Sequence, residues 1–388
     1  MVVDIEPIRT IMNMAGKIQN PLVLTGGGDC SPLNAALRAI VKSLINLHGI
    51  KRVLGSEDSF RGVYENRFRV LDYDSVANIL TRPGSILGND NKFNPFKLMI
   101  EGIEKDVSDV CIENLKSQGI DSIIVIGGDG TMSIASRFIE KFEKLGIEIL
   151  VIGVPKTIDR DVFYTDTTIG FDTAVRQLTQ FINDIRSTAE SHHRIFVIEA
   201  MGRNSGALAL YAGAASGADI ILLPEIAYNI DEICRVVKKR SEKGRRYTII
   251  VVAEGAKETG GEKVIERIIK DSPDPIRYGG IAGQLSEVIE KKTGLDCRSA
   301  EPGHFQRGGA PTPGDINLAT LLGYSAVEML MKGYNNRIAV VQNGTIASSV
   351  SITSVADRQK EVPVNHPLIK ASLAVGISFG NPTILNQD

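Results

Sequence analysis

A single βαβ unit between residues 122 and 161 constrains the fold most strongly. Residues 122–126 and 147–154 are short apolar runs rich in β-branched side chains, which is typical of strands buried on both faces. Residues 132–145 between them have the apolar spacing of an amphipathic helix. Since such crossovers are right-handed, we expect the two strands to be parallel neighbours whose carboxyl ends share one edge of a sheet. Open α/β sheets bind their ligands at that edge.

The first strand ends in residues 127–131, which read GGDGT. Glycines let backbone N–H groups approach a phosphate closely, and the N-terminus of the following helix adds positive potential. Asp129 would repel a phosphate unless a cation lay between them, so the turn implies Mg²⁺. A glycine turn after a strand can also be no more than a turn, and the motif alone leaves that alternative open.

The second strand ends in residues 155–161, which read PKTIDRD. Lys156 offers a cation for a phosphate, and Asp159 or Asp161 could accept a proton from a substrate hydroxyl, as kinases require. An aspartate pair could also belong to a solvated loop. Both turns together, at the same edge of one βαβ unit, favour phosphoryl transfer over these structural alternatives.

Composition and length argue against several classes of protein. The net charge of −2, from 44 basic and 46 acidic residues, and an aromatic content of 5% without Trp indicate no nucleic-acid partner. The four cysteines lie far apart, which is typical of reduced thiols rather than a metal site or disulfides. Without a long apolar run or a leader segment, we expect a cytoplasmic protein with no membrane partner.

Two further strand-and-turn units extend the pattern. Residues 21–25 are an apolar run before GGGD at 26–29, and residues 195–199 are another before AMGRNSG at 200–206. Neither a GxGxxG fingerprint nor a Walker P-loop occurs in the chain. Strands alternate with helices throughout, which predicts an α/β fold built from doubly wound sheets.

A second anion site is predicted from basic residues in the later part of the chain. Arg203 lies in the third glycine turn, and His304 and Arg307 lie in GHFQRGG at 303–309. Arginine binds phosphate bidentately, and histidine can add a hydrogen bond. Each of them alone could equally be an ordinary surface residue.

Four turns together resemble the phosphofructokinase family. The motifs, in the family's order, are GGDGT (127–131), PKTIDRD (155–161), EAMGR (199–203) and GHFQRGG (303–309). TGGGDC at 25–30 and GFDTA at 170–174 are also similar to the family's pattern, so the resemblance covers about residues 20–345. NAD kinases and lipid kinases share a turn like GGDGT, but they do not account for the turn with His304 and Arg307.

The resemblance implies two Rossmann-like domains with the active site in the cleft between them. The phosphoryl-donor domain is expected to comprise residues 1–169 plus about 306–345. The sugar-phosphate domain is expected to comprise residues 170–305 plus about 346–388. The implied reaction transfers the γ-phosphoryl group of ATP, with Mg²⁺, to the 1-hydroxyl of fructose 6-phosphate, as in glycolysis.

The resemblance also implies a role for each matched residue. Asp159 is the expected general base, Thr157 and Asp161 support the transferring phosphoryl group, and Asp129 is the Mg²⁺ ligand. The residues expected to bind the phosphoryl donor are Gly27, Gly28, Lys92, Gly128, Gly130, Thr131 and Lys156. Those expected to hold the sugar phosphate are Met201, Gly202, Arg203, Glu254, His304 and Arg307.

Arg194 and Arg298 match arginines that the family lends to a neighbouring subunit's site, which implies a homodimer or homotetramer. The family includes users of ATP and users of pyrophosphate. Gly130 resembles the ATP users, whereas Lys156 occurs in all pyrophosphate users and in one ATP-using subgroup, so a pyrophosphate-dependent enzyme is the alternative. A regulatory paralogue with weak catalysis is a further alternative.

Three positions depart from the family pattern. Arg160 replaces the usual Asn between the two aspartates, where its charge is expected to lower the pKa of the base. Pro32 lies in a first turn that lacks the usual Pro-Gly pair, and Lys92 stands where many members have Arg. The base and the metal ligand are intact, which favours an active enzyme.

Overall fold

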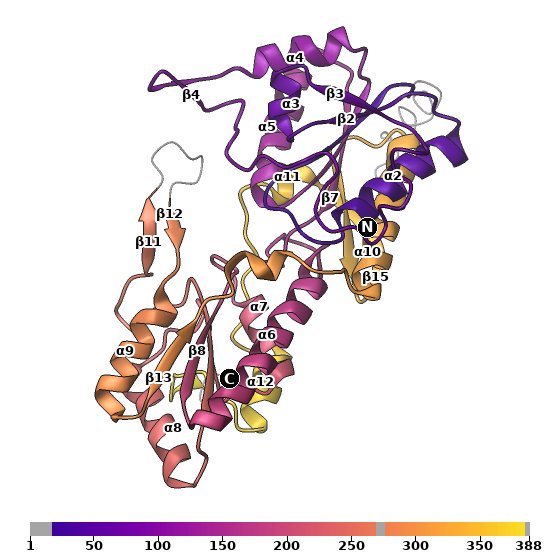
Figure 1. Ribbon diagram of the computed structural model, residues 1–388. Helices are drawn as coiled ribbons and strands as arrows, with labels where there is room; N and C mark the ends of the chain where they lie inside the picture. The colour runs from indigo at the N-terminus through magenta and orange to yellow at the C-terminus, as the bar shows by residue number, and fades with distance from the viewer. Residues whose placement is uncertain (1–17, 269–275, 385–388) are drawn as a thin grey trace, which may run out of the picture.

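The computed structural model describes residues 18–268 and 276–384. Two β-sheets with flanking helices lie one above the other along the length of the molecule (Figure 1). The α/β fold expected from the sequence is therefore confirmed. No helix in these described ranges is long and apolar enough to cross a membrane.

The larger sheet has seven strands in the order β15-β14-β7-β6-β1-β2-β3. Its strands are β1 (Pro21–Thr25), β2 (Val53–Ser56), β3 (Phe68–Leu71), β6 (Ser122–Gly127), β7 (Leu150–Pro155), β14 (Arg337–Gln342) and β15 (Thr345–Ser351). The five inner strands pair in parallel, and the edge strands β3 and β15 pair antiparallel to their neighbours. The carboxyl ends of β1, β6 and β7 consequently lie side by side at one edge.

The smaller sheet has four parallel strands in the order β13-β8-β10-β9. They are β8 (Ile195–Ala200), β9 (Ile220–Leu222), β10 (Thr248–Ala253) and β13 (Cys297–Ala300). Two antiparallel hairpins stand apart from both sheets, one of β4 (Leu98–Ile100) and β5 (Ile103–Lys105), the other of β11 (Ile265–Ile268) and β12 (Ile276–Tyr278).

Helices cover the faces of both sheets (Figure 1). Those of the larger sheet are α2 (Leu33–His48), α3 (Phe60–Tyr64), α4 (Ser108–Ser117), α5 (Asp129–Leu145), α10 (Pro313–Met331) and α11 (Ile352–Val355). Those of the smaller sheet are α6 (Phe171–His192), α7 (Ala207–Ser216), α8 (Ile230–Glu242), α9 (Ile281–Thr293) and α12 (Pro367–Ala374). A 3₁₀ turn, η1, spans Gly303–Arg307.

The βαβ unit expected from the sequence is present as β6–α5–β7, with Val125 paired in parallel to Gly153. Strand β7 begins at Leu150 rather than at residue 147, because α5 ends at Gly146 in the left-handed conformation (φ 62°). Ile147 then donates its N–H to the carbonyl of Phe142, which closes the helix and delays the strand.

The chain passes between the two parts of the molecule more than once. It leaves the larger sheet at α6, returns with α10 and β14, and leaves again after α11, which packs on α5. The division into two domains stays a prediction, and residues 1–17 of the first expected range lie outside the described residues. The domain boundary near residue 345 also stays a prediction; β15, which begins at Thr345, pairs with β14 in the larger sheet.

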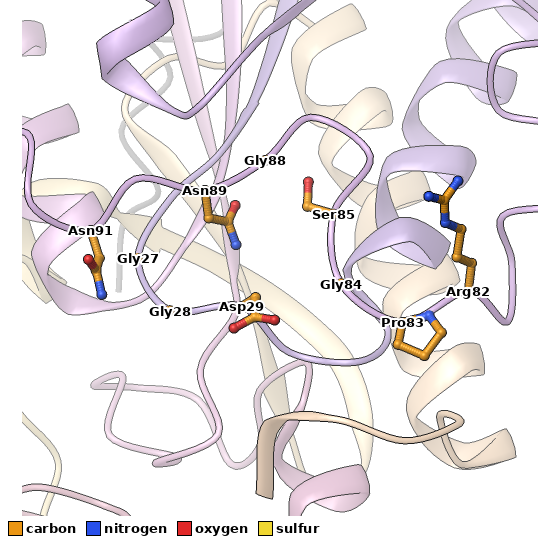
Figure 2. Close-up of a pocket in the computed structure, with 10 residues that line it drawn as sticks. All are labelled: Gly27, Gly28, Asp29, Arg82, Pro83, Gly84, Ser85, Gly88, Asn89 and Asn91. Atoms are coloured by element: carbon orange, nitrogen blue, oxygen red, sulfur yellow. The ribbon is translucent and has the colours of Figure 1, made fainter. Parts of the chain in front are cut away.

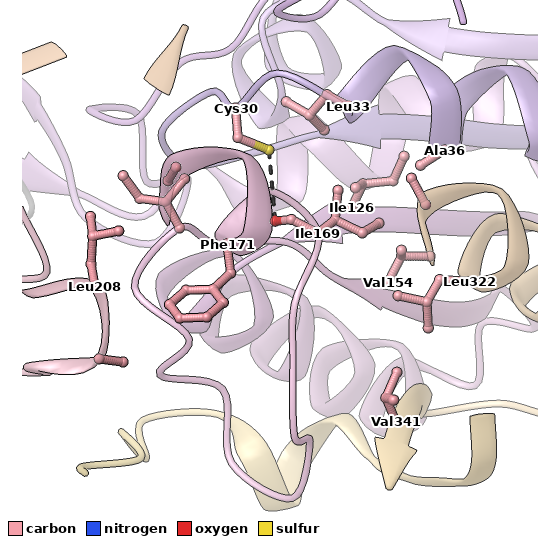
Figure 3. Packing of buried hydrophobic residues seen from close by; sticks show 14 of the residues in the cluster. Cys30, Leu33, Ala36, Ile126, Val154, Ile169, Phe171, Leu208, Leu322 and Val341 are labelled. Atoms are coloured by element: carbon pink, nitrogen blue, oxygen red, sulfur yellow. Dashed lines mark hydrogen bonds between the residues drawn. The ribbon is translucent and has the colours of Figure 1, made fainter. Parts of the chain in front are cut away.

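One hydrophobic core is continuous across the junction (Figure 3). Ile126 and Val154 of the larger sheet belong to the same buried cluster as Leu208 of α7. Phe171, at the start of α6, lies between these groups, and the Cys30 thiol donates to the carbonyl of Ile169 at 3.7 Å (Figure 3). The turns that follow β6 and β7 therefore extend from well-packed strands.

Candidate active site

The turns after β1, β6 and β7 lie in contact with one another. The Nζ of Lys156 donates to the carbonyls of Gly26 (2.6 Å) and Gly28 (2.5 Å), which joins the turn after β7 to the turn after β1. Thr131 packs so closely on the first turn that a Cβ added at Gly26 would lie 2.6 Å from its methyl group. Glycine at position 26 is thus required by this close approach.

Lys156 is almost fully buried, with an exposed fraction of 2%. Burial, to which the positive charge of Arg307 adds, lowers the pKa of this amine to about 8. Its hydrogen bonds are made to backbone carbonyls of the first turn. The sequence predicted a contact with the phosphoryl donor, and the structure adds that Lys156 supports the turn that would surround that donor.

Buried carboxylates lie at the centre of the site. Asp159 and Asp161 have exposed fractions of 8% and 7%. The Oδ1 atoms of Asp129, Asp159 and Asp161 are buried and have no hydrogen-bond partner in the described parts of the chain. Burial, followed by the charges of Asp159 and Asp129, raises the pKa of Asp161 to about 7. Burial and the charge of Asp357 raise the pKa of Asp129.

These buried carboxylates predict a pH-dependent stability. With its pKa raised to about 7, folded Asp161 keeps a proton that the unfolded chain loses near pH 4, so the free energy of unfolding falls as pH rises across this interval. Asp161→Asn removes this ionisation. We expect it to raise the Tm of the ligand-free protein by about 2–5 °C at pH 8 and by a clearly smaller amount at pH 5. Thermal unfolding at both pH values tests this, and an equal gain at both would contradict it.

The residues expected to bind the sugar phosphate gather at the carboxyl ends of β8 and β10. The backbone N–H of Arg203 donates to Oε1 of Glu254 at 2.7 Å, and a Cβ added at Gly255 would lie 1.9 Å from the carbonyl oxygen of Arg203. Gly202 has φ 142°, which favours glycine. Burial raises the pKa of Glu254 to about 7, and the charge of Asp159 adds to this shift, so the two sets of turns face each other.

Gln306 is a site residue that the sequence reasoning missed. It is 1% exposed, and its Oε1 accepts from the backbone N–H of Met201 at 3.1 Å while its Nε2 donates to the carbonyl of Gly303 at 3.2 Å. It therefore fixes η1 against the third glycine turn. Its place within GHFQRGG was the available signal.

Arg307 and His304 differ in their surroundings. Arg307 donates from Nη1 to the carbonyl of Asp29 at 3.2 Å, and a Cβ added at Gly28 would lie 2.6 Å from that nitrogen. This predicted sugar-phosphate ligand thus lies directly on the first glycine turn. His304 is exposed at the start of η1.

Arg194 and Arg298 do not join the other sugar-phosphate residues. Arg194 precedes β8, so about 20 Å of strand separates it from the turn at the other end. Asp296 accepts from Nε of Arg194 at 2.5 Å and pairs with Nη1 of Arg298 at 2.5 Å. The expected contribution of both arginines to a neighbouring subunit stays a prediction.

A polar pocket opens beside the first glycine turn (Figure 2). Its lining residues are Gly27, Gly28, Asp29, Arg82, Pro83, Gly84, Ser85, Gly88, Asn89 and Asn91. The hydroxyl of Thr25, at the end of β1, donates to the carbonyl of Gly88 at 2.9 Å. This bond holds the lining segment that contains Gly88 against β1. Lys92 does not line it, and its backbone N–H bonds Oδ1 of Asp90 at 2.6 Å.

Gly130 faces open space, since a Cβ built there meets no heavy atom of the described chain within 4 Å. Gly128, by contrast, leaves only 3.3 Å between such a Cβ and the carbonyl of Lys156. A side chain at position 130 would therefore project from the start of α5 without disturbing the protein.

A C-terminal strap, residues 357–362, crosses the site and was not expected from the sequence. Lys360 donates its backbone N–H to the carbonyl of Asp161 at 2.7 Å, and Gln359 accepts from Nδ2 of Asn204 at 2.7 Å. Ser133 of α5 donates to Oδ1 of Asp357 at 2.8 Å. The strap thus contacts the acidic turn, the third glycine turn and α5.

The guanidinium of Arg160 contacts two aromatic rings and a backbone carbonyl. It stacks over the rings of Phe171 and Tyr211, with centroids 5.2 Å and 4.7 Å away, and its Nε donates to the carbonyl of Asp166. The expectation that this charge lowers the pKa of the base stays a prediction.

Parallel α/β sheets that bring glycine turns together around buried carboxylates define a phosphoryl-transfer type of protein. The family model described as phosphofructokinase matches residues 20–330. The chain therefore belongs to the phosphofructokinase family.

Individual relatives support the same family. The chain is 45% identical over 378 residues to ATP-dependent 6-phosphofructokinase 2 of Clostridium perfringens, covering 95% of this chain and 100% of that protein. It is 42% identical over 342 residues to the pyrophosphate–fructose 6-phosphate 1-phosphotransferase of Amycolatopsis mediterranei, covering 88% of this chain and 96% of that protein. The T-state crystal structure of Pichia pastoris phosphofructokinase matches 87% of this chain with a TM-score of 0.75 and 28% identity, and the chain spans 35% of that longer protein.

Proposed function

We propose that this protein is an ATP-dependent 6-phosphofructokinase, which transfers the γ-phosphoryl group of ATP to the 1-hydroxyl of fructose 6-phosphate. The observation that carries this proposal is the buried pair Asp159 and Asp161, each with an unpartnered carboxylate oxygen. Lys156, on the same turn, bonds the glycine turn after β1, and the charge of Asp159 acts on Glu254 at the end of β10. A nucleophilic hydroxyl brought to this position would meet a base on one side and a phosphoryl donor on the other.

In this reaction Asp159 accepts the proton of the 1-hydroxyl as the oxygen attacks phosphorus. Thr157 orients the backbone of the turn, because its Oγ1 accepts the N–H of Asp159 at 3.1 Å. Glu254 and Arg203 hold the sugar, together with Met201, Gly202, His304 and Arg307. Phosphoryl transfer depends on such positioning and charge neutralisation more than on covalent help from the protein.

The donor would extend along the glycine turns toward the polar pocket. Gly27, Gly28, Gly128, Gly130 and Thr131 supply close backbone and hydroxyl contacts, and Lys92 and Lys156 supply positive charge. Because the Lys156 amine already bonds two carbonyls, it neutralises the region through the first turn rather than as a free cation. Gly130 leaves the space that a nucleotide needs, which supports ATP over pyrophosphate.

The unpartnered carboxylate oxygens fit a divalent cation. Asp129 is the proposed Mg²⁺ ligand, and bound Mg²⁺ would neutralise charge on the donor phosphates. No group of three or more His, Cys, Asp or Glu side chains in the described ranges is arranged to hold a metal alone. This agrees with Mg²⁺ bound through one or two carboxylates and completed by substrate phosphates and water.

The proposed protein is cytoplasmic and homo-oligomeric, as a dimer or tetramer. Arg194 and Arg298 then serve the sugar-phosphate site of a neighbouring subunit. Their position at the far end of β8 and on β13, away from Arg203, supports a role outside the cleft of their own chain.

A coupled assay on the purified protein tests the proposal, with fructose 6-phosphate and Mg²⁺ and with ATP or pyrophosphate as separate donors. We expect turnover with ATP. Turnover with pyrophosphate but not with ATP would favour the alternative, a pyrophosphate-dependent enzyme, which the Amycolatopsis relative supports. No turnover with either donor would favour the regulatory paralogue.

A further inference from the structure

Arg160 has a conformation that requires an explanation. It separates the two central carboxylates, Asp159 and Asp161, and it has φ 55°. Residues other than glycine rarely adopt this left-handed conformation, although asparagine and aspartate do so more readily than arginine. Arginine therefore carries a backbone cost at this position, and the contacts of its side chain must offset that cost.

Two aromatic rings and one backbone carbonyl hold the guanidinium. Phe171 and Tyr211 form an edge-to-face pair with centroids 5.2 Å apart, and the guanidinium lies over both rings. Its Nε donates to the carbonyl of Asp166, in the loop that follows the acidic turn. A cation stacked on two aromatic faces and held by a hydrogen bond is fixed in direction as well as in position.

The two rings belong to elements that carry the smaller sheet. Phe171 begins α6, and Tyr211 lies on α7, which directly follows the third glycine turn. The acidic turn, in contrast, ends β7 of the larger sheet. Arg160 therefore connects the turn that holds the base to the helix behind the turn that holds the sugar phosphate.

We propose that Arg160 is a positioning residue, which aligns Asp159 with the 1-hydroxyl of the bound sugar through its stacking on Tyr211 and Phe171. This inference rests on the proposed function. A small displacement between a base and its substrate is costly, since a misplacement of about 1 Å can lower a rate by roughly 10²-fold. The Arg160 contact acts on this distance without touching substrate.

Arg160→Asn is the direct test, because asparagine tolerates the left-handed backbone and removes the cation. We expect kcat to fall by about five- to twentyfold, while the equilibrium Kd for fructose 6-phosphate, measured by calorimetry without donor, changes less than about twofold. Arg160→Lys keeps the positive charge but loses the planar guanidinium, and we expect its kcat to lie between those of Arg160→Asn and the wild type. An unchanged kcat in Arg160→Asn would overturn the proposal, as would a loss that appears only in Kd.

Variants of Tyr211 make the test independent of how well Arg160→Asn folds. Tyr211→Phe keeps the ring and should retain kcat, whereas Tyr211→Leu should lower kcat as Arg160→Asn does. In the double variant the two losses should not multiply, because both break one contact. Fully multiplicative losses, or full activity of Tyr211→Leu, would overturn the proposal.

Arg137 provides the matched control. Its guanidinium lies 4.2 Å from the ring centroid of Phe96, so Arg137→Gln also removes a cation–π contact, but one confined to the larger sheet's helices and loops. We expect its kcat to be unchanged, and a loss equal to that of Arg160→Asn would count against a specific role for Arg160. All comparisons are made relative to wild-type turnover, so an inactive wild type would refute the proposed function instead.

Discussion

Replacing Asp159 with asparagine is expected to lower kcat for fructose 6-phosphate phosphorylation by about 10²–10⁴-fold, the usual contribution of a positioned general base. Asparagine preserves the shape of the side chain but cannot accept the hydroxyl proton. Asp159 is 8% exposed, and its Oδ1 has no partner among the described residues, so this oxygen is available to a substrate. The Kd for fructose 6-phosphate should change little, since the base acts on the reacting hydroxyl rather than on the phosphate.

Steady-state kinetics and calorimetry on the same preparation measure the two quantities. Asp109→Asn is a suitable control, because Asp109 lies on α4 with a side chain that is 74% exposed. It makes the same chemical change outside the site and should leave kcat unaffected. An Asp159→Asn variant that keeps more than about a third of wild-type kcat would refute the assignment of the base.

The second large effect is expected from Gly130→Asp, which should lower kcat/KM for ATP by about ten- to a hundredfold. A carboxylate here would face the path of the nucleotide's α-phosphate, and two like charges 4 Å apart cost roughly 1–4 kcal/mol depending on screening. A Cβ at this position meets no heavy atom within 4 Å in the described chain outside its two neighbours and the backbone of its own helix. Its effect should thus fall on the donor rather than on folding.

Gly130→Asn separates charge from size, because it adds a side chain of the same shape without the negative charge. We expect it to lose less activity with ATP than Gly130→Asp does. Any activity with pyrophosphate should fall less than activity with ATP, since pyrophosphate has no α-phosphate or nucleoside to displace. A wild type that uses pyrophosphate and ignores ATP would show that Gly130 does not determine the donor.

The sequence predicted those parts of the fold whose residues show a clear apolar pattern within a short segment. The unit β6–α5–β7 was predictable because its strands are uniformly apolar and its helix has a regular apolar stripe. Strands β3 and β15 were not recognised, because β3 has only four residues and both are edge strands without a continuous apolar run. The positions of the glycine turns also followed from the sequence, since carboxyl ends of parallel strands meet at one edge.

The features that could not be predicted depend on contacts between residues far apart in the chain. The motif around Lys156 predicts a phosphate ligand, yet its amine donates to the carbonyls of Gly26 and Gly28, about 130 residues earlier in the chain. The direction of Arg160 depends on Tyr211, which lies on a helix of the other sheet. The strap at Lys360 has no motif of its own, and its contact with Asp161 exists only because the chain returns to the site.

The repeated passage of the chain between the two sheets has a consequence for biosynthesis. On the ribosome, strands β1, β2, β3, β6 and β7 emerge before the whole of the smaller sheet, whereas β14 and β15 of the same larger sheet emerge after it. The edge of β7 that pairs with β14 must therefore wait for about 180 further residues of translation. The larger sheet cannot be completed before the smaller sheet has been synthesised, and the nascent chain must keep this strand edge open until β14 has left the exit tunnel.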